Sequence, residues 1–406
     1  MNIAVLTFST LFVLNACGTA TTEAQGADVP ATEDPGSAPA ATLTVGAERL
    51  DVLLPLLEGR RVGLVVNHTS MSVDSHLVDR LLARDVDVRT VFAPEHGFRG
   101  LASDGELLDD GVDADTGLPI VSLYGKQKRP TAAMYDSLDL VVFDIQDVGT
   151  RFYTYIYTMY YAMDAAAEYG VDFVVLDRPN PLGAIVDGPL LDTAYRSFIG
   201  LLELPSVHGM TVGELARMYN GEGWLTGGRR AELTVVEATG YSVGDRYEAP
   251  IKPSPNLPTA ASVYLYPTLC HFEGTVASVG RGTDFPFQVV GHPEFRPDTF
   301  AFTPEARPGA AYAKLRGERC YGIDLRGTEA AGAFTGIDWG LLAVVAAGLP
   351  DEVELVARDH FDLVAGGTGL REALREGRLD SFRATYVDDV AAFRERRAPY
   401  LLYERR

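Results

Sequence analysis

The chain has 406 residues. A single hydrophobic core rarely organises a chain of this length, so we expect two domains. Its composition is that of a globular protein, and its formal net charge of -21 argues against nucleic acid, whose phosphates require a basic surface. The same charge means that an anionic substrate would have to be held by individual arginines.

The N-terminus carries an apolar run over residues 3–14, which is too short to span a bilayer as a mature helix and indicates a secretion signal. The segment Leu14-Asn15-Ala16-Cys17 resembles a bacterial lipobox, whose cysteine is lipidated after cleavage. We therefore assign residues 1–17 to a signal peptide with lipidation at Cys17, and residues 18–43, rich in Ala, Thr, Pro and Gly, to a flexible tether. The protein is expected to be exported, either secreted or lipid-anchored in the cell envelope, and to meet a membrane only through that anchor.

From about residue 44 to residue 240 the chain alternates between apolar runs and helical patterns. The predicted strands cover residues 61–67, 86–93, 119–123, 138–145, 171–176 and 231–238. The predicted helices cover residues 76–84, 132–136, 151–168 and 210–219. This alternation predicts a parallel, Rossmann-like sheet with right-handed crossovers and its last strand at an edge. Neither GxGxxG nor GxxxxGK[ST] occurs where a dinucleotide site or a P-loop would need it, so we expect no nucleotide cofactor.

Near residue 240 the alternation ends, and residues 250–267 are rich in proline, so we place a domain boundary there. Residues 241–406 are expected to form a smaller α/β domain that ends, over residues 387–403, in an amphipathic helix and an apolar tail. Its two cysteines, Cys270 and Cys320, are either joined in a disulfide or free and buried. Neither lies in a CxxC pattern, so we expect no structural zinc.

The strand predicted over residues 138–145 is the centre of the first domain, because it is apolar throughout and then ends in Asp144 and Asp147. After a turn at Gly149, a helical pattern places three polar side chains on one face: Arg151, Tyr155 and Thr158. In open α/β sheets, ligands bind beyond the carboxyl ends of the strands. This stretch is therefore where we expect chemistry.

Other predicted strands also carry polar groups at their carboxyl ends, where packing alone would require none. These groups are Asn67, Glu95 with His96, Asp144 with Asp147, and Asp177 with Arg178. Because the ends of parallel strands meet at one edge of a sheet, the pattern predicts a functional cleft there rather than separate loop residues satisfied by their neighbours.

Within this cleft, Glu95 follows Pro94 and would be partly desolvated beneath the second domain, which raises the pKa of a carboxyl and suits a general acid. The alternative is a salt bridge to Arg99. His96 could bind zinc, but no HExxH-type spacing supports it, so we expect no metal. Arg281 lies between two glycines and either contacts an anion across the cleft or is a surface arginine.

The chain resembles the exo-β-N-acetylmuramidases, NamZ-like glycosidases formerly described as a domain of unknown function. The matching motifs are FAPEHGFRG (92–100), SLYG (122–125), FDIQDVGTRFYTY (143–155), LDRPNP (176–181), HGMTVGELA (208–216), SPNLP (254–258), FEGT (272–275) and GRGT (280–283). The resemblance extends from about residue 49 to the C-terminal YLLY at 400–403. Where the family usually has Glu before its Gly-Arg-Gly-Thr, this chain has Val279.

The resemblance implies a Rossmann-like domain, a smaller α/β domain and an active-site cleft between them. It also implies release of N-acetylmuramic acid from the non-reducing end of peptidoglycan fragments, in cell-wall turnover, without a cofactor. The resemblance makes Glu95 the leading candidate for the catalytic acid. Glycoside hydrolysis needs a second catalytic group, for which the candidates are Asp147, Asp144 and the acetamido group of the substrate. The lactyl carboxylate requires a cation, for which Arg151 and Arg281 are the candidates.

The remaining substrate contacts that we expect are Asn67, His96, Tyr155, Asp177 and Arg178. Two other classes of function are weighed against the glycosidase. One is a cell-envelope protein that binds wall fragments without cleaving them, which would tolerate amides in place of Glu95 and Asp147. The other is a metal-dependent esterase or amidase; a serine hydrolase would need a GxSxG elbow, which the chain lacks.

Overall fold

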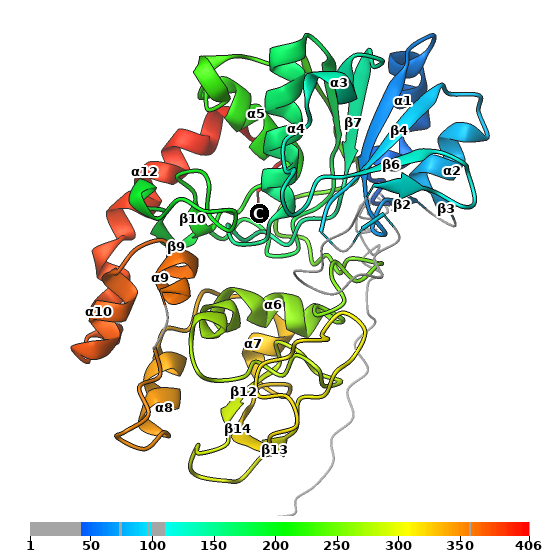
Figure 1. Ribbon diagram of the computed structural model, residues 1–406. Coiled ribbons are helices and arrows are strands. Elements are labelled where there is room, and N and C mark those ends of the chain that lie inside the picture. The colour runs from blue at the N-terminus through cyan, green and yellow to red at the C-terminus, as the bar shows by residue number, and fades with distance from the viewer. Residues whose placement is uncertain (1–41, 73–74, 96, 99–109, 357–358, 406) are drawn as a thin grey trace, which may run out of the picture. The chain divides into compact units, whose positions relative to one another are not determined.

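A seven-stranded sheet with helices around it is the largest element of the fold (Figure 1). The computed structural model describes residues 42–72, 75–95, 97–98, 110–356 and 359–405. The strand order in this sheet is β11-β8-β7-β1-β4-β6-β5, and every pairing is parallel except that of β5 with β6. The prediction of a Rossmann-like parallel sheet is confirmed.

The predicted strands are all present, with ends shifted by up to two residues. They are β1 (Val62–Val66), β4 (Val88–Ala93), β6 (Pro119–Ser122), β7 (Leu140–Asp144), β8 (Asp172–Leu176) and β11 (Leu233–Val236), with the short β5 (Gly111–Val112) added. Strands β1 and β7 are buried along their whole length, which explains their continuous apolar sequence. Strand β11 lies at the edge, as predicted.

Helices cover both faces of the sheet. They are α1 (Leu50–Leu57), α2 (Leu77–Leu82), α3 (Ala132–Tyr135), α4 (Tyr155–Tyr169) and α5 (Val212–Gly221). Alternate residues of β1 enter different cores: Leu64 packs in the core that includes α1 and α2, and Val65 in the core that includes α4 and α5. A capping box begins α5: Thr211 Oγ1 accepts from the Glu214 amide at 3.2 Å, and Glu214 Oε2 accepts from the Thr211 amide at 3.0 Å.

The prediction for the start of α4 was wrong. The helix begins at Tyr155, so Arg151 lies in the preceding turn and does not share a helix face with Tyr155 and Thr158. The turn is held elsewhere, since the Arg151 amide donates to the Ser206 carbonyl at 2.9 Å. Pairing with residues 205–207 therefore competes with helix formation in this segment.

The second half is less regular, as its sequence indicated. The helix α6 (Ala260–Leu269) and the 3-10 turn η4 (Cys270–Gly274) precede a three-stranded antiparallel sheet of order β12-β14-β13. The elements of this half are β12 (Val289–His292), β13 (Ala301–Phe302), β14 (Cys320–Asp324), α7 (Glu329–Gly332), α8 (Gly340–Ala347), α9 (His360–Ala365), α10 (Gly369–Arg375) and α11 (Leu379–Phe382). Cys270 and Cys320 are free and buried, which settles the alternative left open by the sequence.

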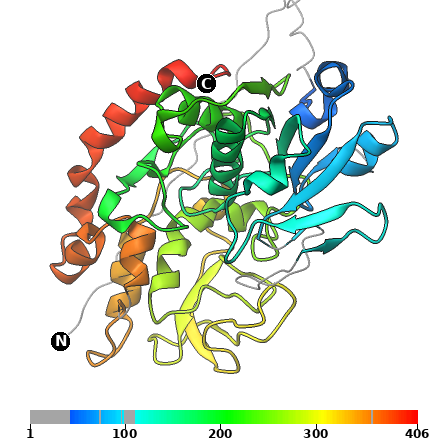
Figure 2. The ribbon, with the colours of Figure 1, turned by 45° about the horizontal axis from the view of Figure 1, so that its top comes forward.

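The C-terminal helix α12 (Val387–Arg397) returns to the first half of the chain (Figures 1 and 2). It packs beside β9 (Asp187–Leu190), which pairs with β10 (Pro205–Val207) in a separate antiparallel hairpin. The tail after it continues to the large sheet, where Tyr403 donates to Asp177 at 2.6 Å. The described residues belong to one compact unit, and the boundary near residue 240 stays a prediction. In the described part of the chain, no helix is long and apolar enough to cross a membrane.

Candidate active site

A pocket of about 160 Å³ lies beyond the carboxyl ends of the sheet strands, between residues of both halves. From the first half it is lined by Glu95, Phe152, Tyr153, Thr154, Tyr155 and Ile199. From the second half it is lined by Ser254, Asn256, Leu257, Tyr266, Cys270, Glu273, Arg281, Phe287, His360 and Val364. Pockets that enclose drug-sized ligands are roughly 300–1,000 Å³, so this one suits a single sugar ring better than an oligosaccharide.

Glu95 follows strand β4 and meets hydroxyl groups on both of its carboxyl oxygens. Tyr124 donates to Oε1 at 2.7 Å, and Thr154 donates to Oε2 at 3.2 Å. The turn after it is tight, because the Gly97 amide donates to the Pro94 carbonyl at 3.0 Å with the glycine at a positive φ of 75°. A hydroxyl group can accept as well as donate, so these contacts can hold Glu95 in either protonation state. His96 and Arg99, named with Glu95 in the sequence, lie outside the described residues.

Arg281 lies on the pocket wall, where the structure places it against a carboxylate. Its Nε donates to Glu273 Oε2 at 3.1 Å, and its guanidinium lies 4.8 Å from the centre of the Phe287 ring. Burial lowers the pKa of Arg281 to about 10, an effect that the nearby charge of Glu95 offsets in part. The guanidinium is therefore a partly desolvated cation within the electrostatic reach of Glu95.

Glu273 is a pocket residue that the sequence reasoning did not single out. It belongs to η4, and Lys314 Nζ holds this turn by donating to the carbonyls of Phe272, Glu273 and Thr275 at 3.0, 3.1 and 2.8 Å. Burial raises the pKa of Glu273, and the charge of Lys314 offsets this in part. The FEGT motif contains this residue, but nothing in its spacing distinguishes Glu273 from a surface carboxylate.

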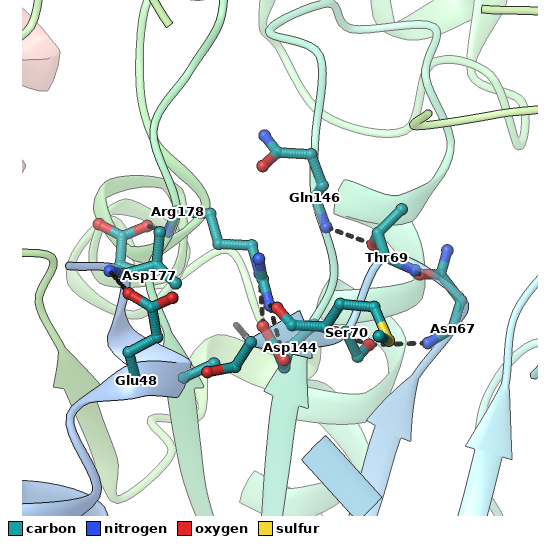
Figure 3. A network of polar contacts seen from close by, with 12 residues as sticks. Glu48, Asn67, Thr69, Ser70, Asp144, Gln146, Asp177 and Arg178 are labelled. Carbon is teal, nitrogen blue, oxygen red and sulfur yellow. Dashed lines mark hydrogen bonds and ion pairs between the residues drawn. The ribbon is translucent and has the colours of Figure 1, made fainter. Parts of the chain in front are cut away.

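A buried polar network lies at the carboxyl ends of strands β1, β7 and β8 (Figure 3). Arg178 donates to both oxygens of Asp144, through Nε at 2.6 Å and Nη2 at 3.0 Å. Figure 3 shows Asn67 on the other side of Asp144, where its Oδ1 accepts from the Thr69 amide at 2.8 Å. The structure thus brings together Asn67, Asp144 and Arg178, but none of the three lines the pocket.

Asp177 is enclosed by a second set of donors. Its side chain accepts from Thr211 at 2.7 Å, from Tyr403 at 2.6 Å and from the Gly213 amide at 2.8 Å. Burial raises the pKa of Asp177 to about 7, and the three hydrogen bonds offset this in part. Asp177 therefore ties α5 and the C-terminal tail to strand β8 and does not reach the pocket.

Asp147 and Arg151 do not line the pocket. Asp147 Oδ2 accepts from the Gly149 amide at 2.7 Å and lies 3.5 Å from His208 Nε2. The Arg151 side chain is fully buried, and its Nη2 donates to the Val364 carbonyl at 3.0 Å. Burial lowers the pKa of Arg151. Of the described residues predicted to act in catalysis or binding, the pocket is lined by Glu95, Tyr155 and Arg281.

Among the described residues, the pocket offers carboxyl groups, hydroxyls, the His360 imidazole and the Arg281 guanidinium. In the described part of the chain, no group of three His, Cys, Asp or Glu side chains could hold a metal ion. Aromatic rings, including Phe152 and Tyr266, form much of the wall. Such a site can bind a sugar ring, contact an anionic substituent and transfer a proton.

Comparison with known proteins gives consistent matches over both halves. The family described as "Exo-beta-N-acetylmuramidase NamZ, N-terminal" matches residues 62–261, and the corresponding C-terminal family matches residues 264–403. The peptidoglycan beta-N-acetylmuramidase NamZ of Bacillus subtilis (strain 168) is 38% identical over 379 residues, covering 87% of this chain and 90% of that protein.

Two crystal structures of DUF1343 family proteins from Bacteroides fragilis NCTC 9343 have similar folds. One is 41% identical with a TM-score of 0.83, covering 90% of this chain and 100% of that chain. The other is 32% identical with a TM-score of 0.75, covering 89% of this chain and 99% of that chain. The α/β fold with its smaller second part is thus shared with solved structures.

Proposed function

Because this chain belongs to the exo-β-N-acetylmuramidase NamZ family, we propose that it is a glycoside hydrolase that releases N-acetylmuramic acid from the non-reducing end of peptidoglycan fragments. The observation that carries the proposal is the position of Glu95 on the wall of a small pocket, with a hydroxyl group at each carboxyl oxygen and Arg281 nearby. A pocket of this size favours attack at a chain end over threading of a polymer.

In the proposed reaction, Glu95 gives its proton to the glycosidic oxygen as the bond to the anomeric carbon breaks. Tyr124 and Thr154 hold the carboxyl group in place before and after the transfer. Arg281 contacts the lactyl carboxylate, which distinguishes a muramic from a glucosamine ring. A guanidinium has five N–H donors and can bind two carboxylates at once, so its contact with Glu273 is compatible with this role.

The test is incubation with a defined disaccharide of N-acetylmuramic acid and N-acetylglucosamine, followed by mass spectrometry of the products. Release of free N-acetylmuramic acid that a chelator does not affect is the expected result. Binding without cleavage would indicate an envelope binding protein, and loss of activity with a chelator would indicate a metal-dependent hydrolase. With a long glycan, early appearance of mid-length oligosaccharides would show cleavage within the chain and contradict exo action.

We also propose that the protein acts outside the cytoplasm, as a lipoprotein anchored through Cys17 or as a secreted protein. The support is the apolar run over residues 3–14 and the cysteine that follows it. These residues lie outside the described part of the chain. Peptidoglycan fragments are the substrate that such a location would supply.

A further inference from the structure

Glu273 and Glu95 reach the same pocket from different parts of the chain. Glu95 follows strand β4 of the large sheet, whereas Glu273 belongs to η4, after α6 in the second half. Among the described residues, these two side chains are the carboxylates on the pocket wall. Both side chains line this pocket, so a ring bound there would have a carboxyl group from each half of the protein.

Hydrolysis of a glycoside needs a group on each side of the anomeric carbon. An acid protonates the leaving oxygen, and a second carboxylate acts at the opposite face, either directly or through a water molecule. Asp144 is poorly suited to the second role, because both of its oxygens accept hydrogen bonds from Arg178. Asp147 does not line the pocket.

Resting on the function proposed above, we propose that Glu273 is the second catalytic carboxylate and acts on the anomeric carbon from the side of the pocket opposite Glu95. Either Glu273, or a water molecule that it deprotonates, supplies the electron pair of the new bond to that carbon. The electron pair of the breaking C–O bond goes to the leaving oxygen, which takes the proton of Glu95. If Glu273 attacks directly, water then cleaves the glycosyl ester and returns the proton to Glu95.

The surroundings of Glu273 suit this role. The Arg281 contact at 3.1 Å favours the ionised form that a base or nucleophile requires. Burial raises the pKa of the same carboxyl, which makes its anion a stronger base. Lys314 Nζ donates to the carbonyls of Phe272 and Glu273 in η4 and to those of Thr275 and Ala277 just after it, so the backbone that carries the carboxylate is held in place before substrate binds.

The experiment uses the full chain and an aryl β-glycoside of N-acetylmuramic acid with an acidic phenol as leaving group. Replacing Glu273→Ala should lower turnover by at least about 10²-fold. Sodium azide should then restore turnover and give the α-glycosyl azide, because the small anion fits the space left at the face opposite the leaving group. The configuration of this product can be read by NMR.

Loss of turnover without an azide product would overturn the proposal, as would a β-azide or full turnover of the variant. Should Glu273→Ala fail to fold, Glu273→Gln keeps the shape of the side chain and must be folded but inactive. The matched control is Glu354→Gln, which removes the charge of an exposed carboxylate paired with Arg375 at 2.6 Å and should leave turnover unchanged. If the unchanged protein releases no muramic acid, the proposed function is wrong. If both the unchanged protein and the Glu273→Ala variant release muramic acid at full turnover, only the role of Glu273 is wrong.

Discussion

Arg178 holds Asp144 through two hydrogen bonds, of 2.6 and 3.0 Å, at the carboxyl end of strand β7. Neither side chain is accessible to solvent beyond a few per cent. Each therefore depends on the other for compensation of a buried charge. This mutual compensation of charge is a structural reason for two polar residues at the carboxyl edge of the sheet, and their predicted roles in catalysis and binding stay predictions.

Removing one partner of this pair should destabilise the protein. We expect Asp144→Ala to lower the free energy of unfolding by about 3–5 kcal/mol, because it leaves the Arg178 guanidinium buried without a counter-charge. Urea unfolding followed by circular dichroism measures this change. The double variant Asp144→Ala with Arg178→Met should recover part of the loss, whereas a catalytic Asp144 would give a stable, inactive protein.

Glu95→Gln should lower turnover on the muramic acid–glucosamine disaccharide by about 10²–10⁴-fold, since glutamine keeps the shape of the side chain but cannot supply the proton. Binding of the substrate should change little. On an aryl glycoside with an acidic phenol, which leaves without protonation, the loss should be much smaller. Equal losses on both substrates would mean that Glu95 is not the acid.

Arg281→Ala should weaken binding of muramic substrates by about 1.5–3 kcal/mol, the range for a hydrogen bond to a charged group. An analogue without the lactyl group should be affected much less. Arg151→Met is the matched comparison, because Arg151 is fully buried and contacts the Val364 carbonyl. We expect its effect to be the same on both sugars, and calorimetric titration of each variant with each sugar decides between the two arginines.

Asp177 should make stability depend on pH. Its pKa is raised from an ordinary 3.8 to about 7 in the folded protein, so the folded state binds the proton more tightly than the unfolded state. The stability that this group contributes is full below about pH 4 and is lost as the pH rises toward 7. Asp177→Asn should flatten this part of the curve in urea unfolding between pH 4.5 and 8, and an unchanged slope would contradict the assignment.

Cys17→Ser should abolish incorporation of a lipid precursor into the protein if Cys17 is the lipidated residue. Membrane fractions labelled with a radioactive fatty acid provide the measurement. Label that persists on the variant would show that the cysteine is not the anchor. Recovery of the unlabelled protein in the medium would be consistent with secretion.

Periodicity in the sequence is sufficient to predict the large sheet, because strands such as β1 and β7 are apolar throughout and are separated by helical patterns. Periodicity does not predict the contacts that irregular segments make. Arg151 is part of a helical pattern in the sequence, but in the structure it lies in a turn that pairs with β10. Glu273 lies in a 3-10 turn without any periodic pattern, so only the folded chain shows that it faces the same pocket as Glu95.

The C-terminal tail also affects when the protein can finish folding. Tyr403 donates to Asp177, and Arg405 donates to Glu214 at 2.6 Å, so the end of β8 and the start of α5 receive partners from the last residues of the chain. Domains generally begin to fold from the N-terminus during synthesis. Here the first sheet cannot complete its buried polar contacts until Tyr403 and Arg405 have left the ribosome. Until then the first sheet lacks these partners, and its exposed segments stay accessible to the chaperones that bind unfinished chains.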